Sequence, residues 1–239
     1  RDVERSRGLG DVYKRQDLNC PVLVHVHTKK GKGYPPAERE PERYHGVGKF
    51  DPRMGVPREH KRDFSAVFGD ELCKLAKNDE TICAITAAMR DGTGLHDFSE
   101  QYPVRFFDVG IAEGHAVAMA AGMAKQGLTP VVAIYSSFLQ RAYDELWHDL
   151  CLNDVPATIL VFGASIFGTT SETHLSFFDI SMLGALPNMR YLAPSCMEEY
   201  LSMLSWSLDH REHPVAIRVP GIGLVSRPDL APAEDADYG

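Results

Sequence analysis

Several side chains that can do chemistry stand just after the apolar runs of this sequence. Glu113 follows FFDVGIA, Tyr135 and Phe138 follow TPVVAI, and His174 comes after ATILVFG. The acid and the imidazole are groups that exchange protons, and the aromatic faces can pack on a ligand. Arg141, three residues beyond Phe138, adds a cation for an anionic group. Together these residue types are a plausible enzyme site.

Glu113 has a simpler interpretation when it is taken alone. It opens a helical pattern, and an acid in the first helical turn complements the helix dipole and helps to satisfy the free N–H groups. The residues by themselves leave this alternative open. The site interpretation is favoured by the other groups that follow neighbouring strands, since the carboxyl ends of parallel strands meet at one edge.

The elements that must position these groups alternate regularly from about residue 62. The pattern predicts helices over 63–79, 95–103, 112–127, 138–154, 176–186 and 196–210. Uniformly apolar strands are predicted over 81–88, 104–110, 129–136, 157–163, 189–194 and 214–220. Such alternation predicts an α/β fold, a doubly wound, mostly parallel six-stranded sheet with helices on both faces. Asp63 or Ser65 could cap the first of these helices.

The segment before residue 61 follows another pattern. Residues 1–16 are polar and Arg-rich without amphipathic period, so we interpret them as a non-native leader, the alternative being a frayed natural helix. Residues 21–28, PVLVHVHT, predict a strand. Residues 29–57 are rich in Gly, Pro and charge, which predicts a long ordered loop or a connector between domains.

Composition narrows the classes of partner. The net charge of −8 disfavours nucleic acid and anionic membranes as main partners. The five cysteines are odd in number and far apart, so a disulfide framework is not expected and a cytoplasmic location fits. The common nucleotide-binding fingerprints are absent from the sequence.

The stretch FFDVGIAEGHAVAMAAGMAKQGLTPVVAIYSSFLQRAYDELWHDL closely resembles the pyrimidine-binding domain of the 1-deoxy-D-xylulose-5-phosphate synthases, thiamine-diphosphate enzymes of the transketolase superfamily. HTKKGKGYPPAEREPERYHGVGKFDP resembles the end of that family's first domain and its linker. The resemblance runs from about Leu18 to Pro220. It implies a transketolase-type transferase that condenses pyruvate with glyceraldehyde 3-phosphate, with loss of CO2, for isoprenoid, thiamine and pyridoxal precursors.

The resemblance implies a role for Glu113 in activating the cofactor. The matching glutamate hydrogen-bonds N1′ of the aminopyrimidine and favours the imino tautomer, which takes the proton from the thiazolium C2. Apolar neighbours such as Ala112 and Met119 would partly withdraw this carboxylate from water. Phe138 matches the aromatic that stacks on the aminopyrimidine, and core packing is its alternative. Met89 and Lys30 are weaker matches near the cofactor.

The resemblance also implies substrate contacts and proton transfer. Tyr135 and Arg218 match residues that bind the substrate phosphate, and Arg141 matches an arginine near the site. A surface ion pair is the alternative for Arg218, and a helix-surface pair with Glu145 is the alternative for Arg141. His45 matches the linker histidine that assists proton transfer, against a solvated loop histidine as its alternative, and His174 is also retained as a catalytic group.

The segment 161–174 matches the family least well. Gly168, Thr173 and His174 are kept, but Gly163 stands where the family has a phosphate-binding arginine, and Thr170 where it has an aspartate. A lost charge-assisted hydrogen bond is worth about 1.5–3 kcal/mol, so a different acceptor substrate stays open. Gly114 replaces a residue that is commonly Gln. A non-catalytic paralogue is a further alternative.

The family binds the cofactor diphosphate and Mg2+ through a Gly-Asp-Gly…Asn motif of its first domain, and this segment is not found in the chain. We therefore interpret 17–60 as a remnant of that domain with the linker, 61–220 as the pyrimidine-binding domain, and 221–239 as the start of a linker to a third domain. Such a fragment is expected to be inactive alone, and the resemblance implies a homodimer at full length.

Overall fold

The computed structural model describes residues 17–41, 43–45, 47–56, 62–164, 174–221, 223–233 and 235–239. The chain divides into two compact units, Arg1–His60 and Lys61–Gly239. Within the described residues, none of the helices has the length and apolar character that crossing a membrane requires.

The described part of the first unit contains a short helix and a cluster of three aromatic rings. Helix α2 (Pro35–Arg39) begins with proline, whose fixed φ suits the first turn of a helix. The Tyr34 and Tyr44 rings lie 5.4 Å apart, and Tyr44 lies 5.7 Å from Phe50. These rings give the predicted ordered loop its small apolar centre.

The strand predicted over residues 21–28 is wrong. The structure assigns no strand there, and Leu23 is 92% exposed while Val26 is 55% exposed. A strand needs a neighbouring strand to satisfy its N–H and C=O groups, and no described strand pairs with this segment. The valine-rich composition signalled strand propensity, but propensity alone does not make a sheet.

The second unit is built on a six-stranded sheet in the order β2-β1-β3-β4-β6-β5, in which every pair is parallel. This confirms the predicted doubly wound α/β sheet. The strands, each inside its predicted range, are β1 (Ile82–Thr86), β2 (Phe106–Asp108), β3 (Thr129–Tyr135), β4 (Thr158–Phe162), β5 (Arg190–Leu192) and β6 (Val215–Arg218).

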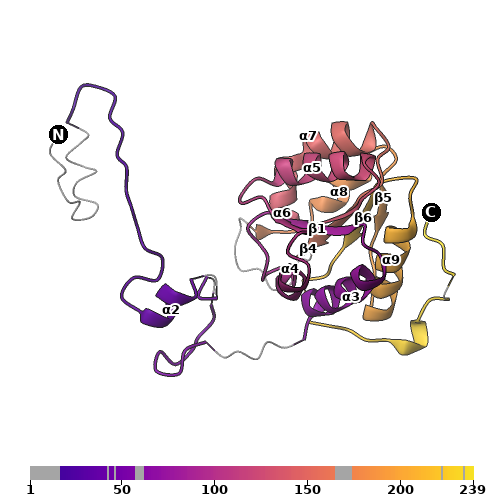
Figure 1. Ribbon diagram of the computed structural model, residues 1–239, viewed down its shortest axis with the longest axis horizontal. Helices are drawn as coiled ribbons and strands as arrows, with labels where there is room; N and C mark the ends of the chain where they lie inside the picture. The colour runs from indigo at the N-terminus through magenta and orange to yellow at the C-terminus, as the bar shows by residue number, and fades with distance from the viewer. Residues whose placement is uncertain are drawn as a thin grey trace. The chain divides into compact units, whose positions relative to one another are not determined.

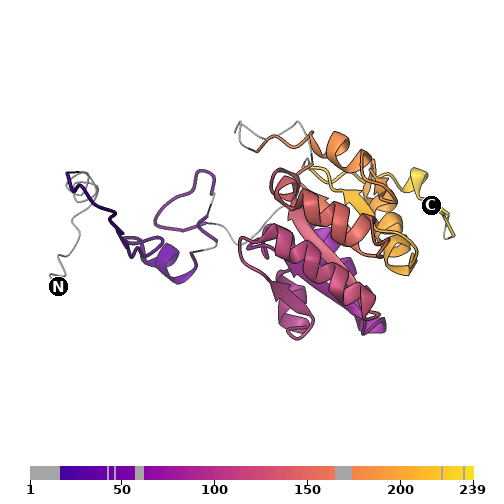
Figure 2. The same cartoon turned by 90° about the horizontal axis from the view of Figure 1, so that it is seen from above.

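Helices cover both faces of this sheet (Figures 1 and 2). One face carries α5 (Glu113–Lys125), α6 (Ser136–Leu139), α7 (Tyr143–Glu145) and α8 (Asp179–Gly184), and the other carries α3 (Phe64–Asn78), α4 (His96–Gln101) and α9 (Met197–Asp209). The Asp63 side chain accepts a hydrogen bond from Ala66 N at 2.9 Å, so Asp63 rather than Ser65 caps α3.

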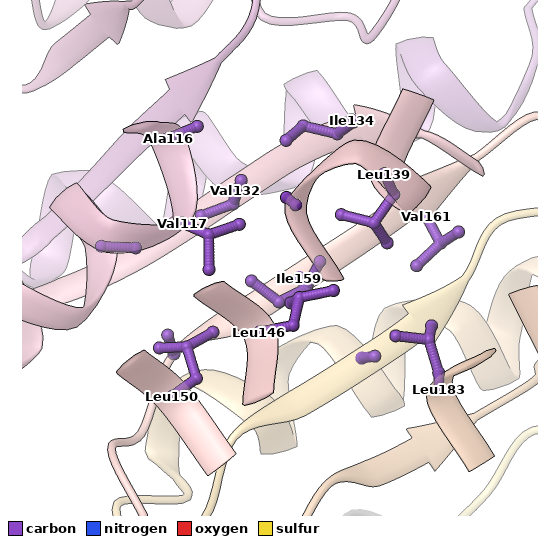
Figure 3. Close-up of a cluster of buried hydrophobic side chains, with 14 of the residues drawn as sticks. Ala116, Val117, Val132, Ile134, Leu139, Leu146, Leu150, Ile159, Val161 and Leu183 are labelled. Carbon is purple, nitrogen blue, oxygen red and sulfur yellow. The ribbon is translucent and has the colours of Figure 1, made fainter. Parts of the chain in front are cut away.

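Each face of the sheet has its own apolar core. On the α5 face, β3 and β4 contribute Val132, Ile134 and Ile159, which pack with Leu146 and Leu150 (Figure 3). On the other face, Phe68 and Leu72 of α3 are fully buried in a second cluster. Burying one such side chain stabilises the fold by about 1.5–3 kcal/mol. The two cores together keep the ends of the strands, where the candidate site lies, in fixed positions.

The single helix predicted over residues 138–154 is instead a series of short helical segments. Behind α6 come a 3-10 turn (Gln140–Ala142), α7 and a π-helical turn (Leu146–Cys151). The break falls at Ala142, whose φ of −102° and ψ of 20° leave the helical region. Ala142 is fully buried, so tertiary packing rather than local sequence fixes this irregularity. Such π-helical turns are frequent at functional sites.

Candidate active site

The candidate site begins where β1 and β3 end, because the connections that leave these neighbouring strands run to opposite sides of the sheet. Ligands of open α/β sheets bind at such a switch point. The Tyr135 hydroxyl donates to Gly92 O at 3.2 Å across this point. A Cβ added to Gly92 would lie 2.9 Å from Met89 Cε and 3.5 Å from the Tyr135 hydroxyl oxygen. The structure therefore brings Met89 and Tyr135 together.

Aromatic rings line the same rim beyond β3. Tyr135 stacks on Phe138 with ring centroids 6.2 Å apart, and Phe138 meets the His174 ring edge-on at 5.5 Å. Burial, more than the nearby Asp63 charge, raises the pKa of the Tyr135 phenol, which stays a neutral hydrogen-bonding group. Phe138 therefore contacts two other predicted site residues, Tyr135 on one side and His174 on the other.

Glu113 is the first residue of α5 and is 2% exposed. Its Oε2 accepts a hydrogen bond from Arg141 Nη1 at 3.0 Å, in an ion pair whose arginine is 60% exposed. A buried carboxylate is costly unless it is paired, and Arg141 supplies that partner for Glu113. Arg141 thus pairs with Glu113, and not with Glu145 one turn further along.

Glu145 nevertheless lies against the same helix end. A Cβ added to Gly114 would lie 2.6 Å from Glu145 Oε1 and 2.9 Å from its Cδ, so only glycine leaves room for this carboxylate without a shift. Glu145 Oε2 is buried and has no hydrogen-bond partner among the described residues. The position of the Glu145 side chain therefore depends on a glycine at residue 114.

Arg218 ends β6 and is held by an acid that the sequence interpretation missed. Its Nε donates to Asp179 Oδ2 at 2.8 Å and its Nη2 to Ser176 O at 3.1 Å. The Tyr191 hydroxyl donates to the same Asp179 oxygen at 2.5 Å. Burial and this hydrogen bond to Asp179 raise the pKa of the Tyr191 phenol. No signal in the sequence marked the pairing of Asp179 with Arg218, because acids are common in the first turns of helices.

Gly163 follows β4 and has a φ of +64°, in the left-handed region that glycine adopts at low cost. A Cβ added there would meet the Tyr135 ring at 3.7 Å, an ordinary contact. Gly163 therefore borders the same aromatic rim. A larger residue at this position would extend beside Tyr135 only with a strained backbone.

Asp108 is a second residue that the sequence interpretation missed. It ends β2, and its Oδ1 accepts from Ala88 N at 2.8 Å and from Gly110 N at 2.9 Å. Ala88 has a φ of +56°, which is strained for a residue with a side chain. Asp108 therefore ties the turns after β1 and β2 together, between Met89 and Glu113. Its place at the end of a strand was a signal that could have identified it.

The remaining sequence-predicted residues lie in the first unit or outside the described residues. Lys30 and His45 are exposed residues of the first unit, described by itself. Gly168, Thr170 and Thr173 lie outside the described residues, as do residues 1–16. Among the described residues, no group of three or more His, Cys, Asp or Glu side chains could hold a metal ion.

The family model described as "Transketolase, pyrimidine binding domain" matches residues 60–223. A protein of Clostridium perfringens (strain SM101 / Type A) named 1-deoxy-D-xylulose-5-phosphate synthase is 50% identical over 240 residues, which are 100% of this chain and 38% of the relative. A protein of the same name from Desulforudis audaxviator is 50% identical over 90% of this chain and 34% of its own length. The chain therefore spans little more than a third of these curated relatives.

Solved structures share the fold at lower identity. A transketolase from Leishmania mexicana superposes with a TM-score of 0.63 at 16% identity, over 73% of this chain and 28% of that one. A structure titled "Split gene transketolase, inactive beta4 tetramer" gives 0.60 at 23% identity, over 74% and 56%. At these identities the likeness is one of fold.

Proposed function

The chain belongs to the transketolase pyrimidine-binding domain family, and on that premise we propose that it is part of a 1-deoxy-D-xylulose-5-phosphate synthase. Such an enzyme condenses pyruvate with glyceraldehyde 3-phosphate and releases CO2. The observation that carries the proposal is the 50% identity, over 100% of this chain, to the Clostridium perfringens protein of that name. The buried acid and the aromatic rim at the sheet edge support it.

The residues present fit the aminopyrimidine half of thiamine diphosphate. Glu113 supplies a buried carboxylate, Phe138 a half-buried aromatic face and Met89 a half-buried thioether along one rim. A flat, partly polar heterocycle needs such a set of contacts. Thiamine diphosphate, when bound, supplies the electron sink for decarboxylation and for carbon–carbon bond formation. Lys30 is a weaker candidate contact, proposed on the resemblance alone.

Glu113 would act by holding a proton at the cofactor's ring nitrogen N1′. Its carboxylate sits at the N-terminus of a 13-residue helix, where the helix dipole favours negative charge. Its Oε2 is engaged by Arg141, and this fixes the orientation of the carboxylate. Arg141 is therefore proposed first as the partner of Glu113, and secondly as a substrate contact through its exposed side.

Tyr135 and Arg218 are proposed to bind the substrate phosphate. A guanidinium has five N–H donors, and those of Arg218 beyond the bonds to Asp179 and Ser176 suit phosphate oxygens. The Tyr135 phenol is neutral, and its single O–H, which donates to Gly92 O, can turn to donate to a phosphate oxygen instead. His174, in contact with Phe138, and His45 of the first unit are proposed to transfer protons during the reaction.

The setting of the enzyme is proposed on family grounds. We propose a transferase that uses Mg2+ with thiamine diphosphate, works as a homodimer in the cytoplasm, and feeds isoprenoid, thiamine and pyridoxal precursors. The domain limits proposed from the sequence, 17–60, 61–220 and 221–239, go with it, as does inactivity of the 239-residue chain alone. The five free cysteines are compatible with a reducing compartment.

The test uses a protein of the full length of the curated relatives that carries this chain's residues. Incubated with pyruvate, glyceraldehyde 3-phosphate, thiamine diphosphate and Mg2+, it should form 1-deoxy-D-xylulose 5-phosphate and one CO2 per product. Omitting thiamine diphosphate is the control. If pyruvate is never decarboxylated under these conditions, a non-catalytic paralogue is the better description.

A second candidate is a related reaction with a different acceptor aldehyde. Gly163 favours it, because glycine offers no cation beside Tyr135, where the resemblance places a phosphate-binding arginine. The same enzyme assayed against a series of phosphorylated and unphosphorylated aldehydes separates the two. Higher kcat/KM for an unphosphorylated aldehyde than for glyceraldehyde 3-phosphate would favour the second candidate.

A further inference from the structure

Asp179 is a buried acid for which the proposed chemistry has no direct use. Its side chain is 0% exposed, although it lies in the first turn of a helix that ends at Gly184. Two donors, the Tyr191 hydroxyl at 2.5 Å and Arg218 Nε at 2.8 Å, converge on one of its oxygens, Oδ2. A buried carboxylate survives only with such charge-assisted partners.

All the described hydrogen bonding of this carboxylate runs through that one oxygen. Asp179 Oδ1 is buried and has no hydrogen-bond partner among the described residues. The carboxylate therefore joins α8 to β5 and β6 through a single oxygen. It holds one guanidinium, Arg218, from one side, and Tyr191 fixes the carboxylate in turn.

Arg218 is held from a second direction by the same segment of chain. Its Nη2 donates to Ser176 O at 3.1 Å, and the Ser176 hydroxyl donates to His174 O at 3.3 Å. One arginine on β6 therefore ties down the stretch from His174 to Asp179, which carries the proposed proton-transfer histidine. The orientation of Arg218 and the placement of this stretch are coupled.

We infer that Asp179 is a positioning residue that sets the specificity of the site for a phosphorylated acceptor. It fixes the guanidinium of Arg218 so that the donors left over face a phosphate at a constant angle, and it does not touch the substrate. This inference rests on the proposed function. A guanidinium held on one edge by a carboxylate loses less freedom when its other edge binds an anion.

The test compares two acceptors in the full-length enzyme that carries this chain's residues. Asp179→Asn keeps the shape and an acceptor oxygen but removes the charge that orients Arg218. It should raise KM for glyceraldehyde 3-phosphate roughly tenfold, the size of one lost charge-assisted hydrogen bond, and leave KM for unphosphorylated glyceraldehyde within about twofold. Asp70→Asn is the matched control, since Asp70 is a half-exposed carboxylate of α3 that pairs with Arg62, and its substitution should leave the ratio of the two KM values unchanged.

The outcomes separate the inference from the proposed function. An equal change in KM for both acceptors, accompanied by a fall in Tm, would show that Asp179 only stabilises the fold, and an unchanged KM ratio would also overturn the inference. If the unsubstituted enzyme forms no product from either acceptor, the proposed function itself fails.

A second measurement covers the case in which Asp179→Asn does not fold. In the 239-residue chain, the Arg218 Nε–H proton should exchange slowly with water in a ¹⁵N NMR spectrum, because it is held by Asp179. Titration with inorganic phosphate should shift the Nη signals of Arg218 and leave the Nε–H signal in place. Rapid exchange of the Nε–H proton without phosphate would contradict the inference.

Discussion

Glu113 shows how much one residue depends on its surroundings. Taken alone in the sequence, Glu113 is more simply interpreted as an acid that complements the helix dipole. In the structure it is 2% exposed and faces the mostly exposed guanidinium of Arg141 at 3.0 Å. This carboxylate is kept out of water and has a cationic partner at the same time, which suits a group that shares a proton with a ligand.

Arg141→Met tests that pairing at the residue scale. Removing the cation leaves a buried carboxylate without its partner, which should lower the free energy of unfolding by about 1–3 kcal/mol. Arg62→Met is the matched control, because Arg62 pairs with Asp70 and both side chains are at least half exposed. That change should cost below about 1 kcal/mol. Urea denaturation of the two variants checks this, and equal costs would mean that Arg141 is only a surface charge.

The sequence pointed to candidate residues but not to their hydrogen-bond partners. Glu113, Tyr135 and Phe138 became candidates because each lies at or just after the end of a predicted strand. Arg141 and its partner Glu113 are 28 residues apart in the sequence. Asp179 and Arg218, which also form an ion pair, are 39 residues apart. No local pattern specifies such contacts, because they depend on how the strand ends converge after folding.

At the scale of elements, close approach between segments decides which glycines are needed. A Cβ added to Gly69, inside α3, would lie 2.1 Å from the carbonyl oxygen of Gly94. Gly94 itself has a φ of +80° and approaches the backbone of Ser65. Helix α3 and the turn after β1, which carries Met89, therefore meet backbone to backbone.

Two helical glycines give opposite predictions for the same substitution. Gly69→Ala should destabilise the chain by about 1–3 kcal/mol, because backbone must move to admit the methyl group. Gly122→Ala, in α5, should stabilise it by about 0.5–1 kcal/mol, since no described atom lies within 4 Å of the added Cβ and alanine favours helix. Thermal unfolding of both variants is the measurement. A loss of stability in both would contradict the role given to the Gly69–Gly94 contact.

Helices and strands were predicted correctly where the apolar pattern of the sequence was strong. The prediction was wrong where contacts with distant parts of the chain determine the local structure. All six strands of the sheet lie within their predicted ranges, because buried parallel strands are uniformly apolar. Residues 21–28 had a similar composition, but none of the described strands pairs with them. The segment 138–154 had a helical period, yet the buried Ala142 interrupts it where α6 and α7 pack on the sheet.

At the scale of the whole molecule, stability should depend on pH on the acid side. Burial lowers the pKa of His210, whose ring stacks on Trp206 and whose Nε2 is buried without a hydrogen-bond partner among the described residues. Hydrogen bonds from Thr81 lower the pKa of Asp79. Both folded-state pKa values lie below their unfolded ones, so the unfolded chain binds more protons and stability falls as the pH falls.

For His210 the loss should begin below about pH 6.5, the ordinary pKa of histidine in an unfolded chain. The urea midpoint of the chain is therefore expected to decrease between pH 7 and pH 5. His210→Gln should make that decrease smaller, since glutamine does not titrate. If the variant loses stability over this range as steeply as the unsubstituted chain, His210 is not the group responsible.

The proposed site residues are divided between the two compact units of the chain. The unit Lys61–Gly239 holds the acid, the aromatic rim and the arginines, and Arg1–His60 holds Lys30 and His45. Glu113 and the residues that contact it therefore lie in one unit. In the proposed function, the buried Glu113 acts on the cofactor rather than on the fold.

In a full-length protein that carries this chain's residues, Glu113→Gln distinguishes a role of Glu113 in catalysis from a role in the fold. Glutamine keeps the size of the side chain but cannot share a proton at N1′, so the rate of 1-deoxy-D-xylulose 5-phosphate formation should fall at least about 100-fold. The Tm of the variant should stay within about 2–4 °C of the Tm of the unsubstituted enzyme. A shift of that size corresponds to about 1 kcal/mol of stability in a domain of 150–250 residues. Near-normal turnover with an unchanged Tm would contradict the account and return Glu113 to the role of a helix cap.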